Sequence, residues 1–146
     1  MKKILLSICF IFLAFSLSQA QEWQNDFGKA KSLAAKQDKP IILVFQGSDW
    51  CAPCIKLNKE IWETEAFQSY AKDHYVMLQA DFPRKAKNAL PAAQQEANNK
   101  LAETYNKNGY FPLVVVLDKN GKVLGNAGYE KTTPAAYIKK IDAFLN

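Results

Sequence analysis

Three short runs of β-branched and aromatic residues, separated by helix-like segments, constrain the fold of this chain most. Residues 41–45, 75–80 and Leu113–Leu117 are apolar almost throughout, which is typical of strands covered on both faces. The segments between them place apolar residues at helical spacing. This alternation predicts an α/β domain with a central mixed β-sheet flanked by helices on both faces.

Four segments are predicted to be helices, either because their apolar residues recur at helical spacing or because a capping residue precedes them. They are residues 23–37, residues 64–70 after a cap at Thr64, a polar stretch that ends at Tyr105, and a terminal segment that starts at Thr133-Pro134. The sequence Asp-Lys-Asn-Gly at residues 118–121 is a hairpin signal, so residues 122–127 are predicted to pair antiparallel with the third apolar run. With no repeat or linker, residues 21–146 are predicted to form a single domain.

The first twenty residues have the pattern of a secretory signal peptide. Lys2 and Lys3 precede an apolar run over residues 4–17, and Ser-Gln-Ala at residues 18–20 provides a cleavage site. The run is shorter than the roughly 20 residues of a membrane-spanning helix, so no stable membrane anchor is expected. We predict that residues 1–20 are removed and that the protein is exported, most simply to a bacterial periplasm.

The charge distribution argues against a nucleic-acid partner. The chain has 19 Lys and Arg residues against 14 Asp and Glu residues, a formal net charge of +5, with no block of five or more basic residues. A short basic cluster at residues 84–87 is interpreted as a solvated loop rather than a docking site for an acidic partner.

Cys51 and Cys54 form a CxxC pair, which is the main functional signal of the mature chain. A structural zinc site needs about four Cys or His ligands, and His74 is the single histidine, so no metal is predicted. A c-type haem motif needs His after the second cysteine, where Ile55 stands. A disulfide that closes so short a loop adds little stability. The pair is therefore predicted to be a redox-active dithiol that uses no cofactor.

The position of Cys51 at the start of a predicted helix favours a thiolate there. Free N–H groups and the positive end of the helix dipole would face its sulfur, while Cys54 would lie one turn inward. The dipole contributes at most ~2 kcal/mol, enough to lower a thiol pKa from about 8.5 to about 7. We therefore expect an exposed Cys51 to attack the substrate and a shielded Cys54 to resolve the mixed disulfide.

Two motifs resemble the thioredoxin-like disulfide oxidoreductases. Trp-Cys-Ala-Pro-Cys at residues 50–54 follows a buried strand, like the active-site motif of that family, and Phe111-Pro112 precedes another strand, like its cis-proline loop. Gly-Ser-Asp-Trp-Cys at residues 47–51 and Ala-Asp-Phe-Pro at residues 80–83 are similar to the exported DsbH-type branch. The resemblance implies a thioredoxin-like fold over nearly all of the mature chain.

The same resemblance implies a substrate site and partners. Pro112 would be cis, the Phe111 backbone would pair with an extended substrate peptide, and Trp50 would shape the edge of the groove. The substrate-binding residues implied are Trp50, Ala52, Pro53, Phe111 and Pro112. Disulfide-containing proteins would be the substrates, and a membrane thiol carrier of the DsbD type would supply electrons.

One position departs from the family pattern. Many thioredoxins have a buried aspartate six residues before the first cysteine, which handles the proton of the resolving thiol, and counting places Phe45 there. Glu60 points away from both cysteines on helical geometry. Water or Asp49 stays open as the proton acceptor, and His74 is given no catalytic role.

The direction of electron flow is predicted from the residues between the cysteines. Ala52-Pro53 is similar to the Gly-Pro pair of reducing thioredoxins and lacks the histidine of strongly oxidising relatives, which favours a reductase. A disulfide isomerase or oxidase stays open as an alternative. So does a non-catalytic module that binds copper through both thiolates.

Overall fold

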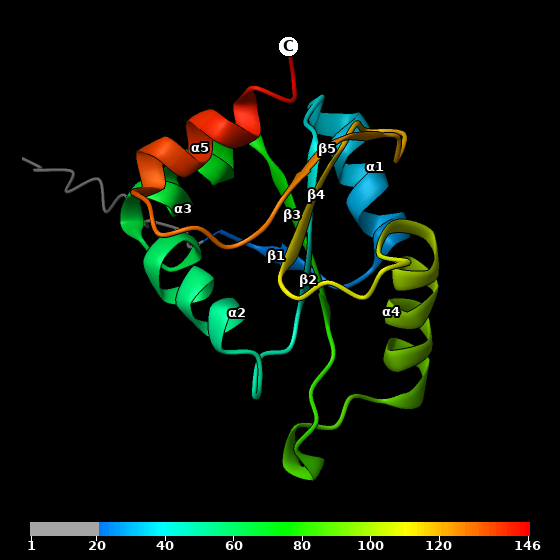
Figure 1. Cartoon of the computed structure of the whole chain (residues 1–146). Coiled ribbons are helices and arrows are strands. Elements are labelled where there is room, and N and C mark those ends of the chain that lie inside the picture. The colour runs from blue at the N-terminus through cyan, green and yellow to red at the C-terminus, as the bar shows by residue number, and fades with distance from the viewer. Residues whose placement is uncertain (1–20) are drawn as a thin grey trace, which may run out of the picture.

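A five-stranded mixed sheet crosses the centre of the computed structural model, which describes residues 21–146 (Figure 1). Its elements are β1 (Trp23–Gln24), α1 (Phe27–Gln37), β2 (Ile41–Gln46), α2 (Ala52–Leu57), α3 (Glu65–His74), β3 (Val76–Asp81), α4 (Ala92–Tyr105), β4 (Leu113–Leu117), β5 (Val123–Ala127) and α5 (Pro134–Asp142). A π-helical turn (Asn58–Trp62) continues α2, and a 3-10 turn (Ala86–Asn88) lies before α4. The predicted signal peptide, residues 1–20, lies outside the described residues.

The strand order brings three loops to one end of the sheet. The order is β1-β3-β2-β4-β5, in which β3 is parallel to β1 and β2, whereas β4 is antiparallel to β2 and β5 to β4. The end of β2 therefore lies beside the end of β3, where Gln46 is opposite Asp81, and beside the start of β4, where Phe45 is opposite Leu113. The loops after β2 and β3 and the loop before β4 consequently meet.

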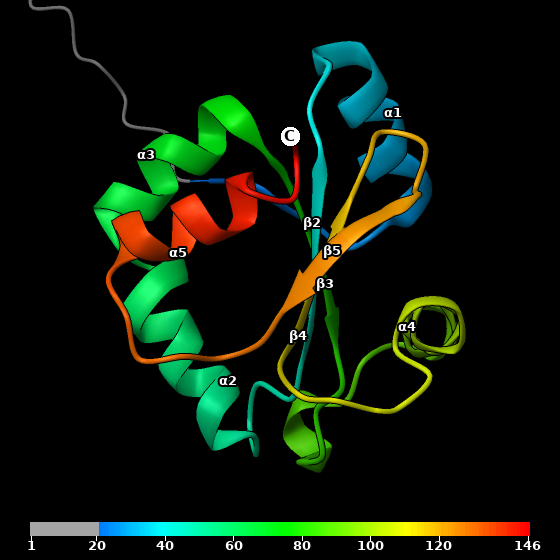
Figure 2. The same ribbon diagram turned by 45° about the horizontal axis from the view of Figure 1, so that its top comes forward.

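Two hydrophobic layers cover the sheet, as the predicted α/β architecture requires (Figure 2). Side chains alternate between the faces of a strand, so Ile42 and Val44 pack with residues of α3 and α5 and the segment after Cys54. Ile41, Leu43 and Phe45 pack on the opposite face with residues of α1 and α4. All five side chains are at most 1% exposed, so β2 is the central strand of the core.

The prediction of one helix over residues 23–37 is wrong at its start. Trp23 and Gln24 form β1, an edge strand that pairs in parallel with Met77 and Leu78 of β3. The helix begins only at Phe27, because the Asp26 carboxylate caps it by accepting a hydrogen bond from the Lys29 N–H at 2.7 Å. Backbone pairing with β3 thus outweighs the helical spacing of Trp23.

The other sequence predictions of caps and of the hairpin are confirmed. Thr64 and Thr133 cap α3 and α5 through their hydroxyls, which accept from the Phe67 and Ala136 N–H groups. Gly121 has φ +91° in the turn between β4 and β5, a conformation that favours glycine. The hairpin adds β5 as an edge strand, and the end of β5, where Ala127 is opposite Val114, lies near the loop that carries Phe111-Pro112.

Candidate active site

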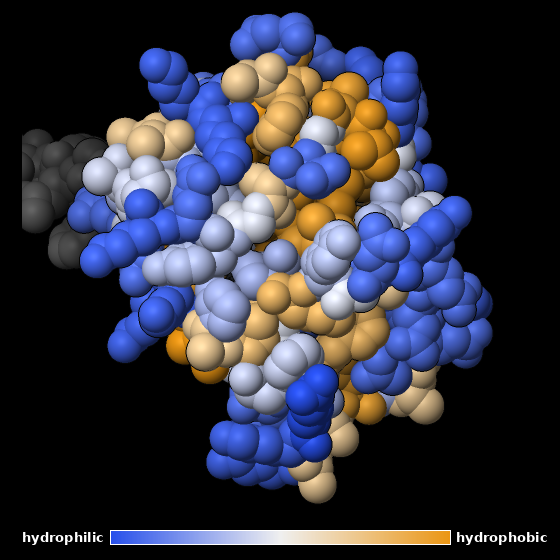
Figure 3. Space-filling model, viewed as in Figure 1, coloured by the Kyte–Doolittle hydropathy of each residue, from blue (hydrophilic) through white to orange (hydrophobic). Residues whose placement is uncertain are grey.

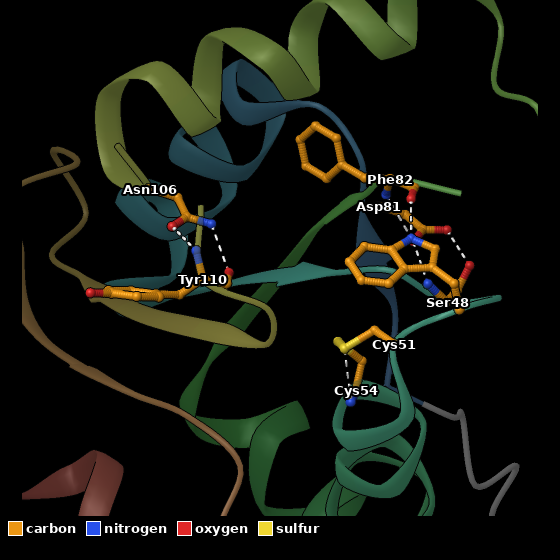
Figure 4. The surroundings of a disulfide bond; sticks show 8 residues. Ser48, Cys51, Cys54, Asp81, Phe82, Asn106 and Tyr110 are labelled. Atoms are coloured by element: carbon orange, nitrogen blue, oxygen red, sulfur yellow. Dashed lines mark hydrogen bonds between the residues drawn. A yellow bond between two sulfur atoms is a disulfide. The ribbon is translucent and has the colours of Figure 1, made fainter. Parts of the chain in front are cut away.

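Cys51 and Cys54 are joined by a disulfide at the start of α2 (Figure 4). Cys51 is the N-cap residue, with an extended backbone, and its Sγ accepts a hydrogen bond from the Cys54 N–H at 3.3 Å. Pro53 stands in the first turn, where a missing N–H costs nothing. The predicted helix start at Cys51 is therefore confirmed, and the sulfur of the first cysteine faces a helix N–H group.

The predicted difference in exposure between the two cysteines is wrong for this disulfide form. Cys51 is 4% exposed and Cys54 is 3% exposed. The reason is that the Cys51 sulfur is directed into the disulfide and toward the helix N–H groups rather than toward solvent. Exposure does not distinguish the two residues here, whereas the N-cap position of Cys51 does.

The segment before the dithiol is fixed around Trp50. The Trp50 Nε1–H donates to the Phe82 carbonyl oxygen at 2.8 Å, and its ring lies edge-on to Phe111 with 5.5 Å between centroids. A Cβ at Gly47 would overlap the Trp50 indole, so the close approach requires glycine. The Arg84 guanidinium lies over the Trp50 ring, 3.6 Å from its centroid. Trp50 therefore joins the loops after β2 and β3 with the loop before β4.

Asp49 holds the loop after β3 and is a weak base. Its carboxylate accepts hydrogen bonds from the Arg84 N–H at 2.9 Å, the Lys85 N–H at 3.0 Å and the Asn88 amide at 2.9 Å. These hydrogen bonds lower the pKa of Asp49 to about 2, and the bond from the Arg84 N–H has the largest effect. The hypothesis that Asp49 accepts the proton of the resolving thiol is therefore not supported.

Phe45, the residue that counting assigns to the position of the family aspartate, is buried and apolar. Its side chain packs with Ala30 and Leu101 on the face covered by α1 and α4, away from α2. The next residue, Gln46, lines a pocket of about 300 Å³ together with Cys54. The residue at the counted position therefore supplies no proton acceptor near Cys54.

A larger pocket lies beside the dithiol. Its volume is about 600 Å³, and it is lined by Pro53, Tyr110, Phe111, Pro112, Leu113, Asn126, Ala127, Gly128 and Tyr129. The Phe111–Pro112 peptide bond is cis, as the family resemblance implied. Three of the five predicted substrate-binding residues line this pocket, namely Pro53, Phe111 and Pro112. Trp50 does not line it but contacts Phe111, and Ala52 is exposed outside it. Hydrophobic and neutral residues also gather at this end of the molecule between charged margins (Figure 3).

Asn106 and Tyr110 are site residues that sequence reasoning missed. Tyr110 is 60% exposed at the pocket, and the backbone at this residue is held by buried Asn106. The Asn106 amide donates to the Tyr110 carbonyl at 2.9 Å and accepts from the Tyr110 N–H at 2.9 Å (Figure 4). The sequence around Asn106, which precedes the turn at Asn108-Gly109, gives no sign that its side chain holds the backbone of the pocket. Tyr110 could have been identified as a site residue, because it directly precedes Phe111-Pro112.

Two further observations bear on ligands and membranes. Within residues 21–146, no group of three or more His, Cys, Asp or Glu side chains is placed to hold a metal ion. None of the helices in that range has the length and apolar character needed to cross a membrane.

Known proteins share this fold and sequence. The sequence model of the family described as thioredoxin-like matches residues 22–119, and the chain belongs to that family. It is 36% identical over 124 residues to the disulfide bond reductase DsbH of Chlamydia pneumoniae, covering 85% of this chain and 72% of that protein. A solved structure of DsbH oxidoreductase matches with a TM-score of 0.80 and 35% identity, covering 87% of this chain and 85% of that one.

More distant relatives agree on the fold. A thioredoxin from Thermus thermophilus matches with a TM-score of 0.62 over 87% of this chain and 88% of that one, at 14% identity, which shows the fold alone. The predicted thioredoxin-like α/β fold and the predicted similarity to the DsbH-type branch are therefore both confirmed. With its Cys51–Cys54 pair in a CxxC motif, the chain is a thiol-disulfide oxidoreductase of the DsbH type.

Proposed function

We propose that the protein is an exported reductase of protein disulfides. The observation that carries the proposal is the position of the Cys51–Cys54 pair at the start of α2, beside a 600 Å³ pocket lined by Pro53, Phe111 and Pro112. A pocket of this volume accommodates a short extended peptide segment around a substrate cysteine. The similarity to a protein named disulfide bond reductase supports the same direction.

The reaction follows from the two sulfur positions. The Cys51 thiolate attacks one sulfur of a substrate disulfide, which forms a mixed disulfide and releases the other substrate sulfur as a thiolate that takes up a proton. The Cys54 thiol then loses its proton, and its sulfur attacks Cys51 Sγ. A Cys51–Cys54 bond forms, the bond to the substrate breaks, and the second substrate sulfur leaves as a thiolate that takes up a proton. Two electrons have passed from the dithiol to the substrate.

The N-cap position makes Cys51 the better nucleophile and leaving group. A Cys51 thiolate would accept the Cys54 N–H that the sulfur already accepts at 3.3 Å, and hydrogen bonding to the charged form lowers a thiol pKa. The residues between the cysteines, Ala52 and Pro53, add no positive charge. Stabilisation of the reduced form is therefore moderate, which keeps the disulfide stable and the couple reducing.

The disulfide form must be reduced again after each turnover. Thiol-disulfide exchange with a second dithiol supplies the two electrons. By family similarity we assign this role to a membrane thiol carrier of the DsbD type, and the substrates to disulfide-containing exported proteins. The pattern of residues 1–20 supports export to a periplasm.

A turnover assay tests the proposal. Catalytic amounts of the chain should accelerate the reduction of insulin disulfides by dithiothreitol, and Cys51→Ser should abolish the acceleration. Lys119→Gln, a substitution in the distant hairpin turn, is the control for surface changes. No acceleration by the wild-type chain, or full activity of Cys51→Ser, would contradict the proposed function.

A further inference from the structure

The resolving cysteine needs a route for its proton. Cys54 is 3% exposed, and its thiol must become a thiolate before its sulfur can attack Cys51 Sγ. Burial in apolar surroundings raises a thiol pKa, so an acceptor near Cys54 would speed this step. The inference that follows rests on the proposed exchange reaction and identifies the acceptor.

A surface pocket beside Cys54 connects this residue to polar side chains. Its volume is about 300 Å³, and its lining residues are Gln46, Ser48, Cys54, Ile55, Asn58 and Gln79. The Gln46 amide donates to Gln79 at 3.2 Å, and the Gln79 amide donates to Asn25 at 3.0 Å. A polar pocket of this size accommodates water. Among the described residues, none that lines this pocket carries a carboxylate.

Ser48 links this pocket to a carboxylate outside it. The Ser48 hydroxyl donates to Asp81 Oδ2 at 2.5 Å, and the Ser48 N–H donates to Asp81 Oδ1 at 2.9 Å. The Phe82 N–H also donates to Oδ1, at 3.0 Å. Figure 4 shows Ser48 and Asp81 facing each other in the surroundings of the disulfide. Asp81 is half-buried at the end of β3, so its carboxylate reaches both the hydroxyl and solvent.

The other nearby carboxylates are engaged elsewhere. Asp49 accepts three hydrogen bonds from residues 84–88, which hold its pKa at about 2. Glu60 accepts a hydrogen bond from the Tyr129 hydroxyl at 2.9 Å and does not line the pocket with Cys54.

Within residues 21–146, two carboxylates are each one side chain away from this pocket: Asp81 through the Ser48 hydroxyl, and Glu63 through the Asn58 amide, which donates to it at 2.6 Å. A hydroxyl can accept one proton while it gives up another, whereas an amide N–H does not exchange its proton in this way. Asp81 is therefore the carboxylate that a proton from the pocket can reach.

We propose that Ser48 and Asp81 relay the proton of Cys54 during resolution of the mixed disulfide. The Cys54 thiol gives its proton to a water molecule in the pocket, that water passes a proton to the Ser48 oxygen, and the Ser48 hydroxyl proton moves to Asp81 Oδ2. The Cys54 electron pair forms the bond to Cys51 Sγ, and the pair of the broken bond leaves on the substrate sulfur. Asp81 then releases the proton to solvent.

Asp81 acts as a relay rather than a store. Its carboxylate is half-buried at the end of β3, so a proton that it receives from Ser48 can pass on to solvent. A carboxylate is a far better acceptor than neutral water. Positioned acid–base groups contribute about 10²-fold to 10⁴-fold to a rate.

Ionisable groups occur on the segments next to Asp81. These segments are the turn that carries Ser48, the loop after Asp81, and α4, whose Asn98 amide donates to the Asp81 carbonyl at 2.9 Å. The ionisable groups are Asp49 in the turn after β2, Arg84, Lys85 and Lys87 in the loop after β3, and Glu96 and Lys100 on α4. The pKa of Asp49 is about 2, and the Glu96–Lys100 pair, 2.8 Å apart, lowers the pKa of Glu96 and raises that of Lys100. These three groups therefore keep their charge between mildly acidic and mildly alkaline pH.

A two-phase release experiment tests the relay. The reduced chain is mixed with one equivalent of dithiobis-nitrobenzoate, whose coloured thiolate leaves first when Cys51 attacks and again when Cys54 resolves the mixed disulfide. Asp81→Asn and Ser48→Ala should slow the second, unimolecular release about tenfold or more at neutral pH. The first release should stay within about twofold of wild type, because neither group acts in that step. Ser48→Thr should restore the second release by keeping the hydroxyl.

The pH profile separates a relay from a structural role. The deficit of Asp81→Asn and Ser48→Ala should disappear above about pH 9, where hydroxide removes the thiol proton directly. Glu96→Gln, which removes a charge on α4 outside this path, should match wild type throughout. An unchanged second release in both variants, or slowing by the same factor at every pH, would overturn the relay. Absence of a second release from the wild-type chain would instead overturn the proposed function.

Discussion

Replacing Asn106 by alanine should loosen the backbone that forms the 600 Å³ pocket. The substitution removes two hydrogen bonds, one to the Tyr110 carbonyl and one from the Tyr110 N–H, both at 2.9 Å. Each typically contributes about 0.5–1.5 kcal/mol, so the free energy of unfolding should fall by about 2 kcal/mol. Asn106 is 5% exposed, and water therefore replaces these partners poorly.

Urea unfolding and two kinetic assays check this prediction. Asn99→Ala is the matched control, since Asn99 is exposed on α4, the helix that precedes Asn106, and its side chain accepts a hydrogen bond from Gln95. Its effect should stay within about 0.5 kcal/mol. For Asn106→Ala, the KM for a peptide disulfide should rise, while the reaction of Cys51 with a small aromatic disulfide should be unchanged. Two results would contradict this prediction. One is an unfolding free energy of Asn106→Ala equal to that of Asn99→Ala, and the other is an equal loss of activity toward the peptide disulfide and the small aromatic disulfide.

Further predictions concern the dithiol, the pocket and the loop after β3. Cys54→Ser should accumulate a mixed disulfide with substrate on Cys51, seen as a mass increase that a reductant removes, and Cys51→Ser should trap none; equal trapping would reverse the assigned roles. Pro112→Ala should weaken the reduction of peptide disulfides more than that of small ones, and equal effects would argue against a peptide groove. The pKa of Asp49 lies near 2, below its ordinary 3.8, so its contribution to stability is present above about pH 4 and is lost as the pH falls toward 2. The urea midpoints of wild type and Asp49→Asn should therefore differ at neutral pH and converge in acid, and a constant difference would show that hydrogen bonding of the ionised group is not the cause.

The sequence predicted the parts of the molecule that depend on local pattern. The buried runs at β2, β3 and β4, the caps at Thr64 and Thr133, and the helix start at Cys51 all follow from periodicity, cap chemistry or a motif. The cis bond at Pro112 followed from family resemblance. Each of these features is encoded within a few neighbouring residues.

The rest depended on contacts between distant segments. Asn106 holds the backbone of the pocket, and Tyr129 reaches it from beyond β5, through a strand register that no local pattern encodes. Ser48 and Asp81 are 33 residues apart in sequence and meet because β2 and β3 end together.

The reduction potential of the Cys51–Cys54 couple tests the proposed direction of electron flow most directly. The chain is equilibrated with mixtures of reduced and oxidised glutathione, and the fraction of dithiol is measured by thiol alkylation. We predict a potential closer to the about −270 mV of thioredoxin than to the about −120 mV of a strong oxidant, with a Cys51 pKa of about 6 to 7.5. A potential near the oxidising end, with a Cys51 pKa below about 5, would contradict a reductase and indicate a donor of disulfides.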